Sequence, residues 1–244
     1  MKQNFKTKQQ LSIFIMGLFV LLSTMFFVLL NVLRTRINGL PIDEKDNFYI
    51  NFSEIFDVFV YFLYYTTLSN IFLGFVMMIL SFKYNSEKVL KWTFNAIILI
   101  TITFLVYWAL ISWTQKWKDI SRSIGSIITR CINPILGFIC LFIVRKKVRF
   151  CIKSVLLCSI LVISYFLFAF IVYFATGANE NFKNGAIIYK FLHFYRPFYV
   201  KNGQLAIIIP LDIIIFLIGL FVPIAIGYFW KFVYRIQNAK CKKQ

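Results

Sequence analysis

Charged residues are scarce in this chain of 244 residues: they make up 15% of it, whereas hydrophobic residues make up 60%. Soluble globular proteins carry about 25% charged residues, so most of this chain does not face water. The chain has one histidine and five cysteines without a C-x-x-C pair, which argues against a metal site, a cofactor or a disulfide framework and favours cysteines that act as small buried hydrophobes. It also lacks the H-E-x-x-H, G-x-x-x-x-G-K-S/T and G-x-S-x-G motifs, so zinc protease, P-loop ATPase and esterase-elbow functions have no support.

Long apolar runs are what the chain has instead. About 20 residues in a helix are needed to cross the roughly 30 Å hydrocarbon core of a bilayer. Six runs meet this length: 11–33, 55–81, 92–113, 123–144, 154–176 and 205–230. The tails and loops between them are too short to fold as a soluble domain. We therefore predict an all-α membrane protein with a single polytopic domain over 1–244, six transmembrane helices in one bundle, and the lipid bilayer as a partner.

Lysine and arginine are unequally divided between the two sides of the predicted bundle. Cytoplasmic loops of membrane proteins are enriched in these residues, so we predict that both termini are cytoplasmic and that the protein lies in a cell membrane. The net charge of +18 follows mainly from this topology, and no loop is long enough for a nucleic-acid recognition module. The abundance of Phe, Ile, Lys, Asn and Tyr is typical of an AT-rich, bacterial genome. There are 16 Lys and Arg in segments 1–10, 82–91, 145–153 and 231–244, against 10 in the longer total of 34–54, 114–122 and 177–204.

Three ionisable residues fall within the predicted spans, where each is costly and therefore a candidate for function. Arg130 and Asp212 lie at similar depth below the outer surface, so an ion pair between them is geometrically possible. Such a pair would be either functional or a structural clamp between two helices. Alternatively, the sixth helix begins at Pro210, and Asp212 stabilises its N-terminus. Asp57 lies about one turn below the outer end of the second span.

Polar residues of the fourth span follow a helical spacing. Pro134 cannot donate the hydrogen bond that the carbonyl of Arg130 would receive, so we expect a kink with a free acceptor beside the charge. A polar stripe in a membrane helix faces other helices or a wet cavity. The residues that share this predicted face are Ser126, Thr129, Arg130, Asn133 and Gly137.

The second span carries a central block of polar and aromatic side chains. Thr66 and Asn70 share one face of the predicted helix, with Ser69 beside them. Hydrogen bonding between helices is the simpler explanation of such residues, but the density of polar groups favours a cavity. The block comprises Tyr61, Tyr64, Tyr65, Thr66, Thr67, Ser69 and Asn70.

This block lies in the stretch Phe62-Leu63-Tyr64-Tyr65-Thr66-Thr67-Leu68-Ser69-Asn70-Ile71-Phe72. The stretch resembles the second-span signature of the androgen-induced family of six-span membrane proteins and its bacterial relatives, which read aromatic-Thr-x-x-Ser-Asn there. A proline at about the place of Pro134, and Tyr195-Arg196-Pro197-Phe198 before the last span, add to the resemblance. It implies hydrolysis of fatty-acid esters by a second-span threonine and a fourth-span histidine.

The catalytic pair that the resemblance implies is incomplete in this sequence. Thr66 or Thr67 takes the role of the threonine, with a register ambiguous by one residue. Arg130 stands where the bacterial pattern has histidine; it cannot act as a base, although it can stabilise an oxyanion or hold a carboxylate or phosphate. His193, the one histidine, lies in the aromatic loop 177–204, where packing is a simpler role than catalysis.

Three functions therefore stay open. The first is a lipid-ester hydrolase, or a diverged lipid-binding member of this family. The second is a small transporter, or a transporter subunit, for an anionic solute. The third is a structural membrane subunit in which Arg130 and Asp212 tie two helices together. The residues predicted to bind a lipid or small anion are Arg130, Asp212, Asn70, Asn133 and Asp57.

Overall fold

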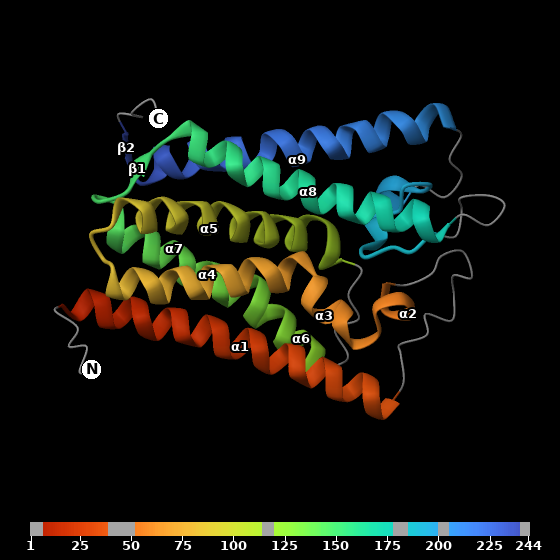
Figure 1. Cartoon of the computed structure of the whole chain (residues 1–244), viewed down its shortest axis with the longest axis horizontal. Helices are drawn as coiled ribbons and strands as arrows, with labels where there is room; N and C mark the ends of the chain where they lie inside the picture. The colour runs from red at the N-terminus through yellow and green to blue at the C-terminus, as the bar shows by residue number, and fades with distance from the viewer. Residues whose placement is uncertain (1–6, 39–51, 114–119, 178–184, 200–204, 240–244) are drawn as a thin grey trace. The chain divides into compact units, whose positions relative to one another are not determined.

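The computed structural model describes residues 7–38, 52–113, 120–177, 185–199 and 205–239, and these residues are mostly helical (Figure 1). Six of the helices are long and apolar enough to cross a membrane, which confirms the predicted all-α membrane fold. Five of the six spans are built on the long helices α1 (Lys8–Asn38), α4 (Tyr65–Phe82), α5 (Glu87–Val106), α8 (Ile152–Thr176) and α9 (Leu205–Val233). The fourth span, Ser123–Val144, consists of α7 (Asn133–Val144) and the shorter helical elements directly before it. Shorter elements are α2 (Phe52–Phe56), a 3-10 turn (Asp57–Phe59), α3 (Val60–Leu63), α6 (Ile120–Ile127) and the strands β1 (Arg149–Phe150) and β2 (Gln237–Asn238).

The second membrane helix begins ten residues later than the sequence predicts. The predicted span 55–81 is wrong at its start, because Tyr64 has an extended backbone (φ −59°, ψ 132°) that separates α3 from α4. The Tyr165 hydroxyl donates a hydrogen bond of 3.0 Å to the carbonyl of Leu63, one of the carbonyls that a helix end leaves without a partner. A contact distant in sequence thus stabilises the break, and residues 55–63 form short helical turns instead.

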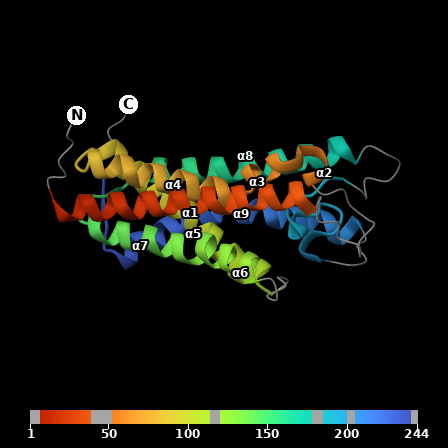
Figure 2. The same ribbon diagram turned by 90° about the horizontal axis from the view of Figure 1, so that it is seen from below.

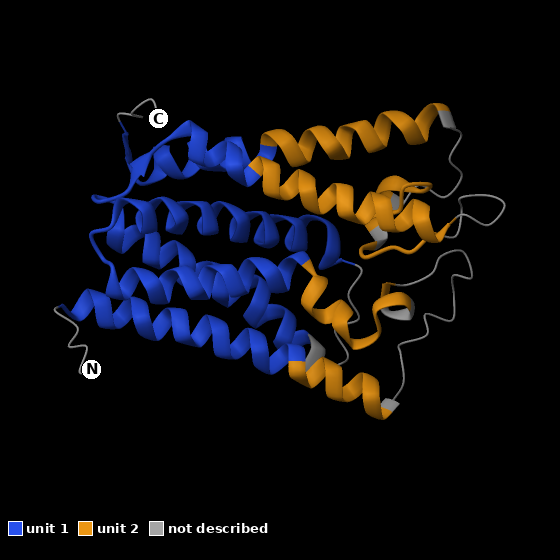
Figure 3. Cartoon of the chain, in the orientation of Figure 1, with its two compact units in different colours: residues 1–28, 65–158, 222–244 blue, residues 29–64, 159–221 orange. Residues whose placement is uncertain are grey.

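The chain divides into two compact units (Figure 3). Unit 1 comprises Met1–Val28, Tyr65–Cys158 and Val222–Gln244. Unit 2 comprises Leu29–Tyr64 and Ser159–Phe221. The single domain over 1–244 stays a prediction.

In unit 1, α1 and α4 lie side by side (Figures 1 and 2) and approach closely at two glycines. A Cβ atom placed on Gly74 would lie 2.5 Å from Cγ of Leu21 and 3.1 Å from the carbonyl oxygen of Gly17. A Cβ on Gly17 would lie 2.9 Å from Cβ of Met77. Small residues let membrane helices pack backbone to backbone, and these two glycines do so here.

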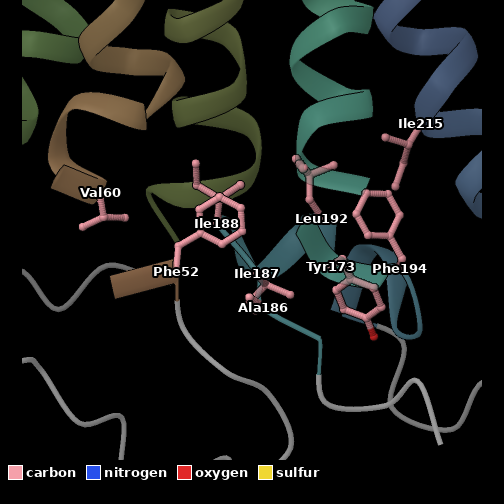
Figure 4. Close-up of a cluster of buried hydrophobic side chains, with 10 residues drawn as sticks. Phe52, Val60, Tyr173, Ala186, Ile187, Ile188, Leu192, Phe194 and Ile215 are labelled. Carbon is pink, nitrogen blue, oxygen red and sulfur yellow. The ribbon is translucent and has the colours of Figure 1, made fainter. Parts of the chain in front are cut away.

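Unit 2 is held together by aromatic and aliphatic side chains (Figure 4). They come from α2, α3, α8, α9 and the segment 185–199. Two hydrogen bonds fix this segment: Phe52 N–H donates to the carbonyl of Ile187 at 3.2 Å, and Ala186 N–H donates to the side-chain hydroxyl of Thr176 at 2.8 Å. The segment therefore packs on the helices of unit 2. The buried members of the cluster are Phe52, Val60, Ala169, Tyr173, Ala186, Ile187, Ile188, Leu192, Phe194 and Ile215.

Candidate functional site

The third and fourth spans each contain a π-helix within unit 1. The first, Tyr107–Ile111, follows α5, and the Ser112 N–H donates to the carbonyl of Tyr107 at 2.8 Å. The second, Ile128–Ile132, joins α6 to α7, and the Asn133 N–H donates to the carbonyl of Ile128. A π-helix inserted in an α-helix is rare and is frequently found at functional sites. These two segments therefore define the candidate site.

Pro134 leaves a free carbonyl in the fourth span, as the sequence predicts, but at a different residue. In the register of the π-helix, an N–H at position 134 would bond to the carbonyl of Thr129, five residues earlier, and proline has no N–H. The side chain of Asn70 on α4 supplies the missing donor, since its Nδ2 lies 2.9 Å from the Thr129 oxygen. The expectation that this acceptor is the carbonyl of Arg130 was therefore wrong by one residue.

Asn70 and Asn133 form the centre of a buried polar network. Both side chains are fully buried, and Asn133 Nδ2 donates to Asn70 Oδ1 at 2.8 Å. Asn133 also contacts α1: its Oδ1 accepts from the Ser23 hydroxyl at 3.3 Å, and its Nδ2 donates to the Thr24 hydroxyl at 3.4 Å. Asn70 further donates to the carbonyl of Thr66 at 2.7 Å. Both predicted binding residues thus join α1, α4 and the fourth span.

The predicted polar stripe of the fourth span divides in two at the π-helix. A π-helix adds one residue to a turn, so the side chains after it point in a different direction around the helix axis than an uninterrupted α-helix would give them. Asn133 consequently faces α1 and α4, and a Cβ on Gly137 would lie 3.1 Å from Leu73 on α4. Ser126 and Arg130, in contrast, lie beside Tyr107 of the third span.

Arg130 and Tyr107 are the polar core of the candidate site. The Cζ atom of Arg130 lies 4.9 Å from the centroid of the Tyr107 ring, a cation–π contact. Tyr107 is 1% exposed, and its hydroxyl is within hydrogen-bonding reach of the side chains of Ser126 and Arg130. Nε of Arg130 is buried and donates to no acceptor among the described residues. The guanidinium therefore has a hydrogen-bond donor to offer to a ligand.

Asp212 lies on α9 in unit 2, whereas Arg130 belongs to unit 1. The Arg130–Asp212 pair therefore stays a prediction. The alternative, a sixth helix that begins at Pro210, is wrong because α9 starts at Leu205 and contains Pro210 in its second turn. Oδ1 of Asp212 is buried and accepts no hydrogen bond from the described part of the chain.

Asp57 is not inside a membrane span. It opens the 3-10 turn between α2 and α3 with a positive φ of 47°. Its carboxylate forms an ion pair of 2.8 Å with Arg36, and the side chains of Arg36 and Asp57 are 63% and 49% exposed. Asp57 thus has a cationic partner at the surface of unit 2, and the depth predicted for it was wrong.

The predicted catalytic residues lie in different units. Thr66 and Thr67 are on α4 in unit 1, and neither hydroxyl bonds to a carboxylate or imidazole among the described residues. His193 is in unit 2 and is 4% exposed. Its Nδ1 accepts from the Tyr195 N–H at 3.2 Å and lies 3.5 Å from the Tyr173 hydroxyl. Burial, with the nearby charge of Arg196, lowers the pKa of His193 to about 4, so the imidazole is neutral at pH 7.

Two of the described cysteines, Cys140 and Cys158, follow the predicted pattern of buried thiols, whereas Cys131 is only half-buried. All three are free. Cys151 is disulfide-bonded, so the expectation of thiols alone was wrong there. Cys241 lies outside the described residues.

Tyr107, Ser23 and Thr24 were not predicted from the sequence. Tyr107 stands in a chain of which 20% is aromatic, so nothing local distinguishes it. Ser23 and Thr24 are isolated polar residues in a long apolar run, where hydroxyls commonly bond to their own helix, as the Thr24 hydroxyl does to the carbonyl of Val20 at 2.6 Å. The amide side chain of Asn133 needs hydrogen-bond partners inside a membrane span, and it was the one feature of the sequence that indicated a role for hydroxyls such as those of Ser23 and Thr24.

Comparison of the chain with protein-family models, with curated proteins and with solved structures finds no match in any of the three. The class follows from the fold: the chain is a multi-pass, α-helical membrane protein. The similarity to the androgen-induced family stays a prediction.

Proposed function

We propose that this membrane protein binds the carboxylate or phosphate group of a lipid or small solute at Arg130. The observation that carries the proposal is the buried Nε of Arg130, which has no acceptor among the described residues. A buried donor without an acceptor costs about 1–3 kcal/mol, and a carboxylate or phosphate satisfies arginine with two parallel hydrogen bonds. Tyr107 supports the site by holding the guanidinium over its ring.

Binding fits the candidate site better than ester hydrolysis. A threonine nucleophile needs a base within hydrogen-bonding reach, and the hydroxyls of Thr66 and Thr67 bond to no such group in the described structure. The third hydroxyl of the motif, on Ser69, is 2.7 Å from that of Thr103 and 3.1 Å from the carbonyl of Thr66. The hydroxyl of Ser69 is therefore engaged in packing α4 against α5.

We also propose that the protein lies in a bacterial cell membrane with both termini cytoplasmic. The excess of Lys and Arg in the segments between alternate spans supports this orientation. In this orientation, α6 and Arg130 lie toward the outer half of the bilayer. The anion would then reach Arg130 from the outer side.

Thermal unfolding of the purified full-length chain tests the proposed function. Unfolding is followed by tryptophan fluorescence in neutral detergent, with increasing oleate, acetate or inorganic phosphate. A ligand at 100 times its Kd raises the free energy of unfolding by about 2.7 kcal/mol, which is about 5–10 °C in Tm for a chain of this size. We expect Arg130→Gln to abolish this rise and Arg34→Gln, a half-buried arginine of unit 2, to retain it.

The ligands and variants separate the possible outcomes. A rise with oleate alone identifies a lipid, and a rise with acetate or phosphate identifies a small solute. Equal rises in the wild type, Arg130→Gln and Arg34→Gln would refute a site at Arg130. Hydrolysis is tested separately by fluorophosphonate labelling of membranes: labelling that is lost in Thr66→Ala or Thr67→Ala would replace binding by catalysis as the function.

A further inference from the structure

A second candidate binding surface in unit 1 is the concentration of positive charge at one end of its helices. This basic end consists of segments 83–91, 145–153 and 231–235. They contain ten Lys and Arg residues and one acidic residue, Glu87. We propose that the basic end is a binding surface for the phosphate headgroups of anionic phospholipids.

Specific contacts bring these segments together (Figure 1). β1 and β2 pair in parallel, with Arg149 opposite Gln237, and the Ala239 N–H donates to the carbonyl of Phe150 at 2.8 Å. The side chains of Arg149 and Gln237 are also hydrogen-bonded to each other. The turn between α4 and α5 joins the same end, because Lys147 Nζ donates to Asn85 Oδ1 at 2.7 Å. Charges that are distant in sequence thus form one surface.

Aromatic rings hold several of these cations in place. Lys147 Nζ lies 3.6 Å from the centroid of the Tyr84 ring, and Lys231 Nζ lies 4.9 Å from that of Phe150. Arg145 Cζ lies 4.3 Å from the centroid of the Phe142 ring. Aromatic side chains that support cations are typical of the interface between membrane and water. The cations are therefore ordered before a ligand arrives.

Arg235 lies at the end of α9, in a backbone conformation that favours glycine, so we infer that this position holds arginine for its charge. α9 ends in a Schellman motif: the Ile236 N–H donates to the carbonyl of Lys231 at 2.9 Å, and the Arg235 N–H donates to that of Phe232 at 3.2 Å. Arg235 occupies the left-handed position of this motif with φ 51°, where glycine is the usual residue because it has no Cβ. Arg235 is exposed, so packing does not explain its presence.

Membrane lipid fits this surface better than a soluble anion does. The cations directly flank the ends of the spans: Lys83 follows α4, Arg145 follows α7, and Lys231 is in the last turn of α9. The ends of membrane helices lie at the level of the headgroups. Each basic residue near an anionic leaflet strengthens binding about fivefold, and the attraction weakens as salt rises.

Native mass spectrometry of the full-length chain in neutral detergent measures this binding. The probes are dioctanoyl phosphatidylglycerol and the zwitterionic dioctanoyl phosphatidylcholine. We expect the wild type to prefer phosphatidylglycerol, and Arg235→Gly and Lys146→Gln to raise its Kd about fivefold each without changing that of phosphatidylcholine. Arg235→Lys should retain the affinity.

Two controls separate a charge effect from damage to the fold and from the site at Arg130. Arg235→Gly should unfold at the same temperature as the wild type or higher, since glycine suits the left-handed position. Arg34→Gln should bind phosphatidylglycerol like the wild type, whereas a loss of binding confined to Arg130→Gln would assign the lipid to the site at Arg130 and overturn a binding surface at the basic end. Equal affinity of the wild type for the two lipids, or an equal loss in Arg34→Gln, would overturn the proposal. Displacement of the lipid by equimolar glycerol phosphate would also overturn it in favour of a soluble anion.

Discussion

The fully buried side chain of Asn70 offers the sharpest test of the candidate site. Asn70→Leu keeps the approximate size of the residue and removes its amide. The change deletes hydrogen bonds to the carbonyls of Thr66 and Thr129 and the bond accepted from Asn133. Only the Thr66 bond lies within one helix. The Thr129 carbonyl loses the donor that replaced the missing N–H of Pro134, and Asn133 Nδ2 keeps only its long bond to α1.

The magnitude follows from these losses. Hydrogen bonds between membrane helices contribute about 0.6–1.7 kcal/mol each, and each buried group left without a partner adds about 1 kcal/mol or more. Asn70→Leu should therefore lower the free energy of unfolding by about 3 kcal/mol, or the Tm by about 6–12 °C. Asn95 is a matched control, because it is 2% exposed and its amide oxygen accepts one bond, from the Ser154 hydroxyl at 3.1 Å.

Thermal unfolding in detergent, followed by circular dichroism, measures both changes. We expect Asn95→Leu to lower the Tm by about a third as much as Asn70→Leu does. The double variant Asn70→Leu/Asn133→Leu should cost less than the sum of the single variants, because it removes both partners of one bond. Equal Tm values for the two single variants, or strict additivity in the double variant, would refute the network.

Three further predictions use the same measurement of unfolding. Gly74→Ala should destabilise the protein by about 1–3 kcal/mol because its Cβ has no room, whereas Gly219→Ala, whose Cβ would lie 3.5 Å from its nearest neighbour, should be neutral or stabilise α9 by up to about 1 kcal/mol. Burial lowers the pKa of His193 from 6.5 to about 4, so protons bind preferentially to the unfolded chain. Stability should therefore fall as the pH falls from about 6.5 to 4, by at most about 3 kcal/mol, and His193→Gln should lose this dependence. Asp57→Asn should change stability by less than about 1 kcal/mol because its ion pair with Arg36 is exposed, and a larger loss would show that the 3-10 turn depends on it.

The six spans could be predicted because a helix needs about 20 apolar residues to cross a bilayer, and apolar runs of this length can be read directly from the sequence. The start of the second span could not, since residues 55–64 are as apolar as a span and the break at Tyr64 depends on Tyr165, about a hundred residues away. Asn70 is bonded to Thr66 within α4, but the acceptor is the backbone carbonyl of Thr66, so the face shared by their side chains stays a prediction. The π-helix at Ile128–Ile132 could not be predicted: Pro134 indicates an interruption, but the register of that interruption depends on an amide from another helix.

The break at Tyr64 also has a consequence for the membrane around the protein. It leaves α4 with 18 residues, about 27 Å at 1.5 Å per residue, which is slightly less than the roughly 30 Å of an ordinary hydrocarbon core. Its neighbour α1, with 31 residues, is about 46 Å long, so it tilts in an ordinary bilayer and can span a thicker one by tilting less. α4 has no such extra length, because a longer α4 would require the extended residue Tyr64 to become helical. The second crossing therefore limits the bilayer thickness that suits this protein, and thicker lipid would strain the joint at Tyr64 first.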